Sequence, residues 1–275
     1  MLAGIALSLP IAAGAARADF QDNIIGYRYG TQFKEPGVAN GADIAKHILN
    51  FTHVDSYAYG SNFFSADWLL SDSIDPAYGG GTGAQEVYIV YRHDLSLNKV
   101  TGTKTFAIAG IIRDVAIHAG MDFNTKNTSF APGKRLLVVG PQLEFDVPGF
   151  FNVAFNYSRE WNNNGIVGKS VDFDPAFEIE AAWGFKFPAC VTTVNVTGFF
   201  NYVAAKGRNG FGNQTKYEIL TRPELLFDAG QPFGKKGFVE LGVGYEYWLN
   251  KFGNDAGKDP GALARTPMIL GKVHF

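Results

Sequence analysis

The stretch Val239-Glu240-Leu241-Gly242-Val243-Gly244-Tyr245-Glu246-Tyr247 alternates large apolar side chains with acidic residues or glycine. Successive side chains of a β-strand point to opposite faces, so the odd-numbered residues here share one apolar face. Glu240 and Glu246 lie on the other face. A strand of this kind separates an apolar medium from a polar one.

The same two-residue period recurs along the chain. It runs through residues 151–161, 171–186, 193–202, 216–227 and 269–275. The segment 171–186 places four carboxylates on one face, those of Asp172, Asp174, Glu178 and Glu180. The final segment ends on the aromatic residue Phe275, as expected for the last strand of an outer-membrane β-barrel.

The connections between these segments alternate between short turns and longer polar loops, which predicts an all-β fold. We expect a single closed antiparallel transmembrane β-barrel of about twelve strands, with short periplasmic turns and longer extracellular loops. Closure is required because backbone polar groups in lipid must all be paired. The predicted strands are about 22–33, 48–58, 62–70, 84–94, 104–123, 134–146, 150–162, 171–187, 191–206, 214–228, 236–250 and 265–275.

The amino terminus predicts export. Residues 2–15 are apolar or small, and Ala16-Arg17-Ala18 has the small-x-small form of a secretory cleavage site. We therefore expect a signal peptide at 1–18, a barrel at 19–275 and a location in the bacterial outer membrane. The chain is 18% charged and slightly acidic, which disfavours nucleic acid as a partner.

Three features conflict with simple strands. Pro141 and Pro223 lie inside predicted strands and cannot donate to a ladder, so each is expected at a bulge or at the rim. Arg159 falls on an apolar face and must lie near the membrane interface. The alternation changes phase near Arg113 and Asp114, which favours a bulge there.

The charged faces predict a water-filled interior and a polar path for a solute. The candidates for contact with that solute are Asp174, Glu178, Glu180, Arg222 and Glu240. A barrel of this size encloses a narrow lumen, intermediate between a packed core and an open pore.

No cofactor or metal is expected. The tract Gly79-Gly80-Gly81-Thr82-Gly83 lacks the Lys and Ser or Thr of a phosphate-binding loop, so a flexible linker is the better interpretation. The five histidines show no metal-ligand spacing. The single cysteine, Cys190, lies in a predicted turn.

Residues 50–64 (NFTHVDSYAYGSNFF) and 83–92 (GAQEVYIVYR) resemble the amino-terminal half of the nucleoside-specific channel-forming (Tsx-like) outer-membrane family. The resemblance implies a monomeric twelve-stranded barrel that passes nucleosides, with aromatic rings stacking on the base and ionisable groups bonding the sugar. By position in these stretches it implies solute contacts for Tyr57, Tyr59, Phe63, Tyr88 and Arg92. The expected partners are a small-molecule solute and outer-membrane lipid.

Two other classes of protein fit parts of the sequence. An outer-membrane phospholipase would need a Ser/His pair on its outer rim, and His53 with Ser56 or Ser61 is the nearby combination. A period of two places His53 and Ser56 on opposite faces. A soluble β-barrel or β-sandwich binding protein is the second alternative.

Overall fold

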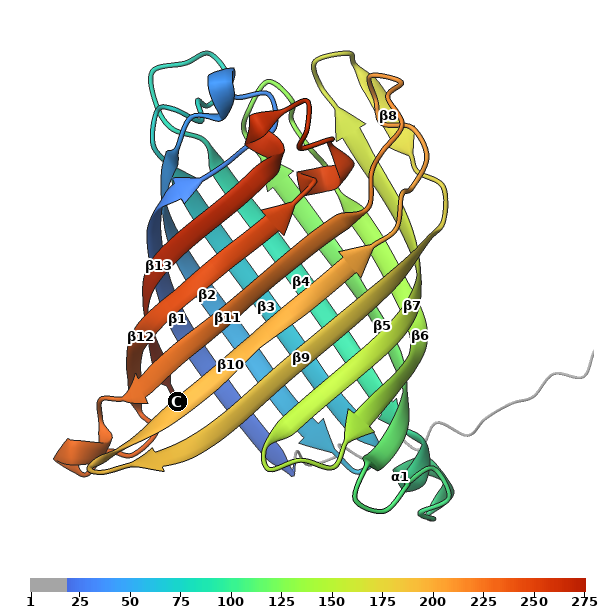
Figure 1. The fold of residues 1–275 in the computed structure, drawn as a ribbon, viewed down its shortest axis with the longest axis vertical. Helices are drawn as coiled ribbons and strands as arrows, with labels where there is room; N and C mark the ends of the chain where they lie inside the picture. The colour runs from blue at the N-terminus through green and yellow to red at the C-terminus, as the bar shows by residue number, and fades with distance from the viewer. Residues whose placement is uncertain (1–18) are drawn as a thin grey trace, which may run out of the picture.

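The computed structural model describes residues 19–275, which form a closed β-barrel (Figure 1). Twelve long strands pair antiparallel with their neighbours, and a short extra strand, β8, pairs with the tip of β7. The wall closes where β1 pairs with β13, from Ile24 opposite His274 to Tyr29 opposite Ile269. A closed wall has no free sheet edge, so the soluble β-sandwich alternative is wrong. The predicted signal peptide lies outside the described residues.

The strand bounds follow the sequence alternation closely. The strands are β1 Phe20–Phe33, β2 Ile44–Tyr57, β3 Gly60–Ser71, β4 Gln85–Ser96, β5 Ile112–Lys126, β6 Arg135–Phe145, β7 Phe150–Asn164, β8 Lys169–Asp172, β9 Ala176–Ala189, β10 Thr192–Val203, β11 Glu218–Asp228, β12 Val239–Leu249 and β13 Leu263–His274.

The alternation separates an outer wall from an inner one. On β2, Lys46 and Ile48 point inward and are 2% and 1% exposed, whereas their neighbours Leu49 and Phe51 point outward and are 42% and 39% exposed. Most outward side chains are aromatic or aliphatic. The outer wall therefore suits lipid and the inner wall is largely polar.

Long loops gather at one end of the barrel, and short turns gather at the other end with the carboxyl terminus (Figure 1). The link between β4 and β5 is the exception at the short-turn end, because it contains the helix α1, Leu97–Thr101. Short turns of outer-membrane barrels face the periplasm, so the carboxyl terminus lies on that side. No helix among residues 19–275 is long and apolar enough to cross a membrane.

Some local predictions were wrong. Residues 104–111 belong to the link before β5 and not to a strand. The predicted strand 171–187 is in fact two strands, β8 and β9, because residues 173–175, which include Pro175, form no strand. Pro141 and Pro223 lie inside their strands, away from the rim, and neither is at a bulge. The residues before and after each proline pair with the next strand in the same register, and pairing is lost only at the proline and its immediate neighbours. The bulge predicted near Arg113 is confirmed by a register shift between Ile112 and Asp114.

Candidate functional site

The lumen holds an ion-pair cluster around Arg92, which we call the Arg92 cluster (Arg92, Asp94, His118, Asp122 and Glu180). Arg92 Nη1 lies 2.6 Å from Asp122 Oδ1, and Arg92 Nη2 lies 2.7 Å from Glu180 Oε1. Arg92 Nε also donates to Glu180 Oε2 at 2.9 Å. The two nitrogens of His118 lie 2.6 Å from Asp94 Oδ1 and 3.0 Å from Glu180 Oε2.

The pair between Arg92 and Glu180 crosses part of the lumen. Arg92 belongs to β4 and Glu180 to β9, and strands β5, β6 and β7 lie between them in the wall. The Arg92 side chain passes over Gly120 of β5, where an added Cβ would lie 2.4 Å from Arg92 Cδ. Glycine at this position thus leaves the space that Arg92 needs to reach inward.

The wall behind this pair carries polar atoms without a partner. Among the described residues, Gln142 Nε2, both amide atoms of Asn156 and Glu178 Oε2 are buried and have no hydrogen-bond partner in the chain. Asn156 and Glu178 are directly opposite each other on β7 and β9, and both are 1% exposed. A buried polar atom left unpaired costs about 1–3 kcal/mol, so these atoms lower the stability of this part of the wall.

Two other predicted residues extend the cluster. The hydroxyl of Tyr88 donates to Asp122 Oδ2 at 2.8 Å and accepts from Lys134 Nζ at 3.0 Å. Phe63 points inward directly opposite Arg92 on the neighbouring strand and is 38% exposed. It therefore offers an accessible aromatic ring beside a guanidinium.

The wall formed by β11–β13 supplies further ion pairs. Arg222 Nη2 lies 2.7 Å from Glu246 Oε2, and the guanidinium carbon lies 5.3 Å from the centre of the Phe199 ring. Glu240 Oε2 lies 3.3 Å from His274 Nε2. Arg222 and Glu240 thus face the lumen, as the sequence predicts.

Acidic residues outnumber basic ones on the inward faces of the strands. The inward acids are Asp22, Asp67, Glu86, Asp94, Asp114, Asp122, Glu144, Glu160, Glu178, Glu180, Glu218, Glu224, Asp228, Glu240 and Glu246, and the inward Lys and Arg residues are Arg28, Lys46, Arg92, Lys126, Lys186, Arg222 and Lys272. A narrow passage with this lining attracts cations and repels anions.

A second buried cluster ties the loops to the long-loop end of the lumen. Glu35, in the loop after β1, lies 2.5 Å from Lys46 Nζ and 3.1 Å from Lys251 Nζ. Lys126 Nζ lies 2.8 Å from Asp75, which belongs to the next loop. Burial alone would raise the pKa of Glu35, but the charges of Lys126, Lys251 and Lys46 hold this pKa well below its usual range. Three loops are thereby fixed to the barrel mouth.

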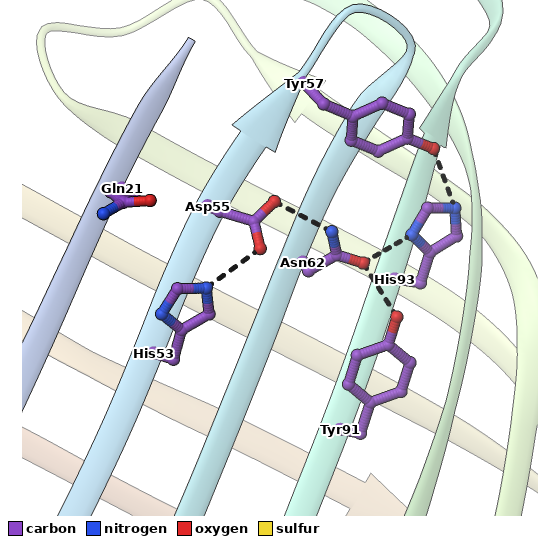
Figure 2. A pocket seen from close by; sticks show the side chains of 7 residues that line it. All are labelled: Gln21, His53, Asp55, Tyr57, Asn62, Tyr91 and His93. Atoms are coloured by element: carbon purple, nitrogen blue, oxygen red, sulfur yellow. Dashed lines mark hydrogen bonds and ion pairs between the residues drawn. The ribbon is translucent and has the colours of Figure 1, made fainter. Parts of the chain in front are cut away.

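Not every predicted solute contact lies in the lumen. Tyr57 points to the outer wall, because it shares a face with Asp55 and His53 and hydrogen-bonds outward-facing His93 (Figure 2). Tyr59 lies in the turn between β2 and β3, and Asp174 lies exposed in the loop after β8. The lumen assignment is therefore wrong for Tyr57, whereas Phe63, Tyr88, Arg92, Glu178, Glu180, Arg222 and Glu240 do face inward.

The structure shows whether His53 can reach Ser56 or Ser61, as the phospholipase alternative requires. Ser56 and Ser61 pair directly with each other on the inner face. His53 points outward and bonds Asp55 at 3.1 Å. Neither serine can reach His53, so this version of a catalytic site is wrong.

Several inward residues were missed by sequence reasoning. His118 and Asp122 lie in a strand whose start was misplaced, and Glu35, Asp75 and Lys251 lie in loops. The two-residue alternation after the bulge would have placed His118 and Asp122 on the inner face. The loop residues follow no such alternation, so the sequence does not show that they point inward.

Several solved structures of outer-membrane proteins align with most of this chain. The KdgM porin aligns with 92% of this chain and 99% of its own, at a TM-score of 0.45 and 12% identity. The NanC porin aligns with 92% of this chain and 98% of its own, at a TM-score of 0.46 and 12% identity. The translocator domain of autotransporter NalP from Neisseria meningitidis aligns with 96% of this chain and 90% of its own, at a TM-score of 0.45 and 12% identity. No protein-family model matches the sequence, and the search of curated proteins also gives no match.

The strand pairing itself defines the fold. The wall is closed, its outer face is mainly apolar and its inner face is charged. These properties define a transmembrane β-barrel of the bacterial outer membrane.

Proposed function

We propose that this barrel is a channel for passive uptake of small polar solutes, and that nucleosides are the solutes it carries. The observation that supports this most is the pair between Arg92 and Glu180, which narrows a polar lumen without filling it with apolar side chains. A narrow polar passage selects by size, by hydrogen bonding and by charge.

The lining fits a flat neutral molecule. Phe63 supplies a face on which a base can stack, and stacking tolerates any base. The inward carboxylates can accept hydrogen bonds from sugar hydroxyls. The acidic excess disfavours anionic solutes.

The same observations favour a monomer as the working unit, since one barrel supplies the whole lining. Purified protein in liposomes tests the solute class. Labelled nucleosides should enter these liposomes faster than sugars or amino acids of similar size. Equal rates of entry for nucleosides, sugars and amino acids would still indicate a channel but would contradict a preference for nucleosides.

A further inference from the structure

A polar hollow opens on the outer wall of the barrel, at the short-turn end of β1–β4. Its lining is Gln21, His53, Asp55, Tyr57, Asn62, Tyr91 and His93, and its volume is about 520 Å³ (Figure 2). The strand register points these side chains away from the lumen, on the same face as the exposed residues Leu49 and Phe51. The hollow is therefore separate from the solute path.

Hydrogen bonds hold the hollow together. Asp55 accepts from Asn62 Nδ2 at 2.9 Å and lies 3.1 Å from His53 Nε2. Asn62 Oδ1 accepts from the Tyr91 hydroxyl at 2.7 Å and lies 2.9 Å from His93 Nδ1 (Figure 2). The network fixes a carboxylate, two imidazoles and two phenols on a surface that faces lipid.

Membrane packing alone does not require polar residues here. On strands β9, β11, β12 and β13 the outward positions near the short turns hold Phe187, Phe227, Leu241 and Val273, all of them exposed. Polar groups facing hydrocarbon are unfavourable unless they are paired with a polar partner. The pairing within the network makes these groups tolerable beside lipid, and the open space next to them leaves room for the polar group of a bound molecule.

An apolar groove continues from the hollow. It shares Tyr91 and His93 with the hollow, and Ala119, Met121, Leu137, Val139 and Tyr157 line it further along. Trp161 and one charged residue, Arg159, which pairs with Asp172, also line it. Its volume is about 540 Å³. Ala119 lies between His93 and Val139 in the register, and its small side chain leaves the wall recessed there.

We propose that the hollow and the groove together bind one zwitterionic phospholipid of the periplasmic leaflet, a phosphate diester with a primary ammonium. The headgroup occupies the hollow, where Asp55 faces the ammonium and the imidazole and phenol groups face the phosphate. One acyl chain lies in the groove. The order of the two surfaces matches a lipid of this leaflet, because the polar part is next to the periplasmic turns and the apolar part extends toward the membrane centre.

Native mass spectrometry of the purified protein in detergent tests this site. The probes are phosphatidylethanolamine and phosphatidylglycerol with identical acyl chains. The expected result for the unaltered chain is one bound phosphatidylethanolamine, with an affinity about tenfold above that for phosphatidylglycerol.

Two variants probe the two halves of the site independently. The double variant His53→Leu/Asp55→Leu removes both members of the hydrogen bond between His53 and Asp55 and should abolish the preference between the lipids. Ala119→Phe fills the groove and should weaken binding of both lipids about tenfold. Ala181→Phe, on the outward face of β9, is the matched control and should bind like the unaltered chain.

Equal affinity for the two lipids in the unaltered chain would overturn the proposal, and so would unchanged binding in both site variants. A stable dimer of the unaltered chain that dissociates in the double variant would also overturn the proposal, since a second copy of the chain would then occupy the hollow. These outcomes do not depend on transport, because the hollow lies outside the lumen.

Discussion

The Arg92 guanidinium and the Glu180 carboxylate form a bidentate ion pair across part of the lumen, with Arg92 Nη2 2.7 Å from Glu180 Oε1 and Arg92 Nε 2.9 Å from Glu180 Oε2. The two residues are 88 positions apart in the chain and belong to strands that are not neighbours. The pair therefore spans part of the lumen between these two strands.

Removal of this pair should widen the channel. In Arg92→Gln/Glu180→Gln, single-channel conductance is expected to rise, because two paired side chains no longer meet in the lumen. Arg92→Gln alone should destabilise the barrel by about 3–5 kcal/mol, since it removes the guanidinium that Glu180 and Asp122 share. Arg159→Gln, which alters an ion pair on the outer side, should leave conductance unchanged. A lower conductance in the double variant would contradict the assignment.

Ion selectivity should follow the charge of the inner wall. Glu178→Lys is expected to weaken the preference for cations and Arg222→Glu to strengthen it, as measured by reversal potentials in a salt gradient. Lys258→Glu, in an exposed loop, provides the control. If folded Glu178→Lys and Arg222→Glu channels kept the original reversal potential, these residues would not line the path.

The ring of Phe63 should contribute to nucleoside binding. Phe63→Leu is expected to weaken block of the current by nucleosides about tenfold, since stacking on one base is worth about 1–3 kcal/mol. Phe64→Leu changes the next residue, which faces outward, and should have no effect on block. Equal effects of the two substitutions would rule out stacking on Phe63.

Glu35 should hold the loops at the barrel mouth in a pH-dependent manner. Its pKa in the folded chain is depressed below the value of about 4.3 expected in the unfolded chain. The carboxylate therefore stabilises the folded state above about pH 4.3, and this contribution is lost as the pH falls through the depressed value.

Glu35→Gln is expected to lower stability by about 3–5 kcal/mol at neutral pH, because Lys46 and Lys251 lose their carboxylate. The difference from the unaltered chain should shrink below about pH 4. Unfolding by denaturant at several pH values measures both effects. Asp43→Asn breaks the exposed pair with Lys34 in the same loop and should change stability by about 0–1 kcal/mol. A pH-independent effect of Glu35→Gln would contradict the role given to its charge.

The barrel could be predicted from the sequence because one physical constraint, lipid outside and polar groups inside, acts on every strand. Residues 239–247 and 176–186 obey it without exception, and Glu178, Glu180 and Glu240 were therefore placed correctly. The bulge after Ile112 was visible as a change of phase.

The alternation fails where the outer wall is itself polar. In β2, His53 and Asp55 face outward while Val54 faces inward, so polarity no longer identifies the lumen and Tyr57 was misplaced. The pair of Arg92 with Glu180 could not be predicted either, because it depends on the curvature of the wall and on the space above Gly120. The loop cluster at Glu35 depends on three loops that meet only in the folded chain.

The most direct test of the central claim, a polar passage through a closed barrel, is a planar-bilayer recording of the purified protein. We expect discrete current steps that favour cations and are blocked by nucleosides, with little block by sugars or amino acids. Folded protein that inserts into the bilayer and gives no current steps would contradict the claim.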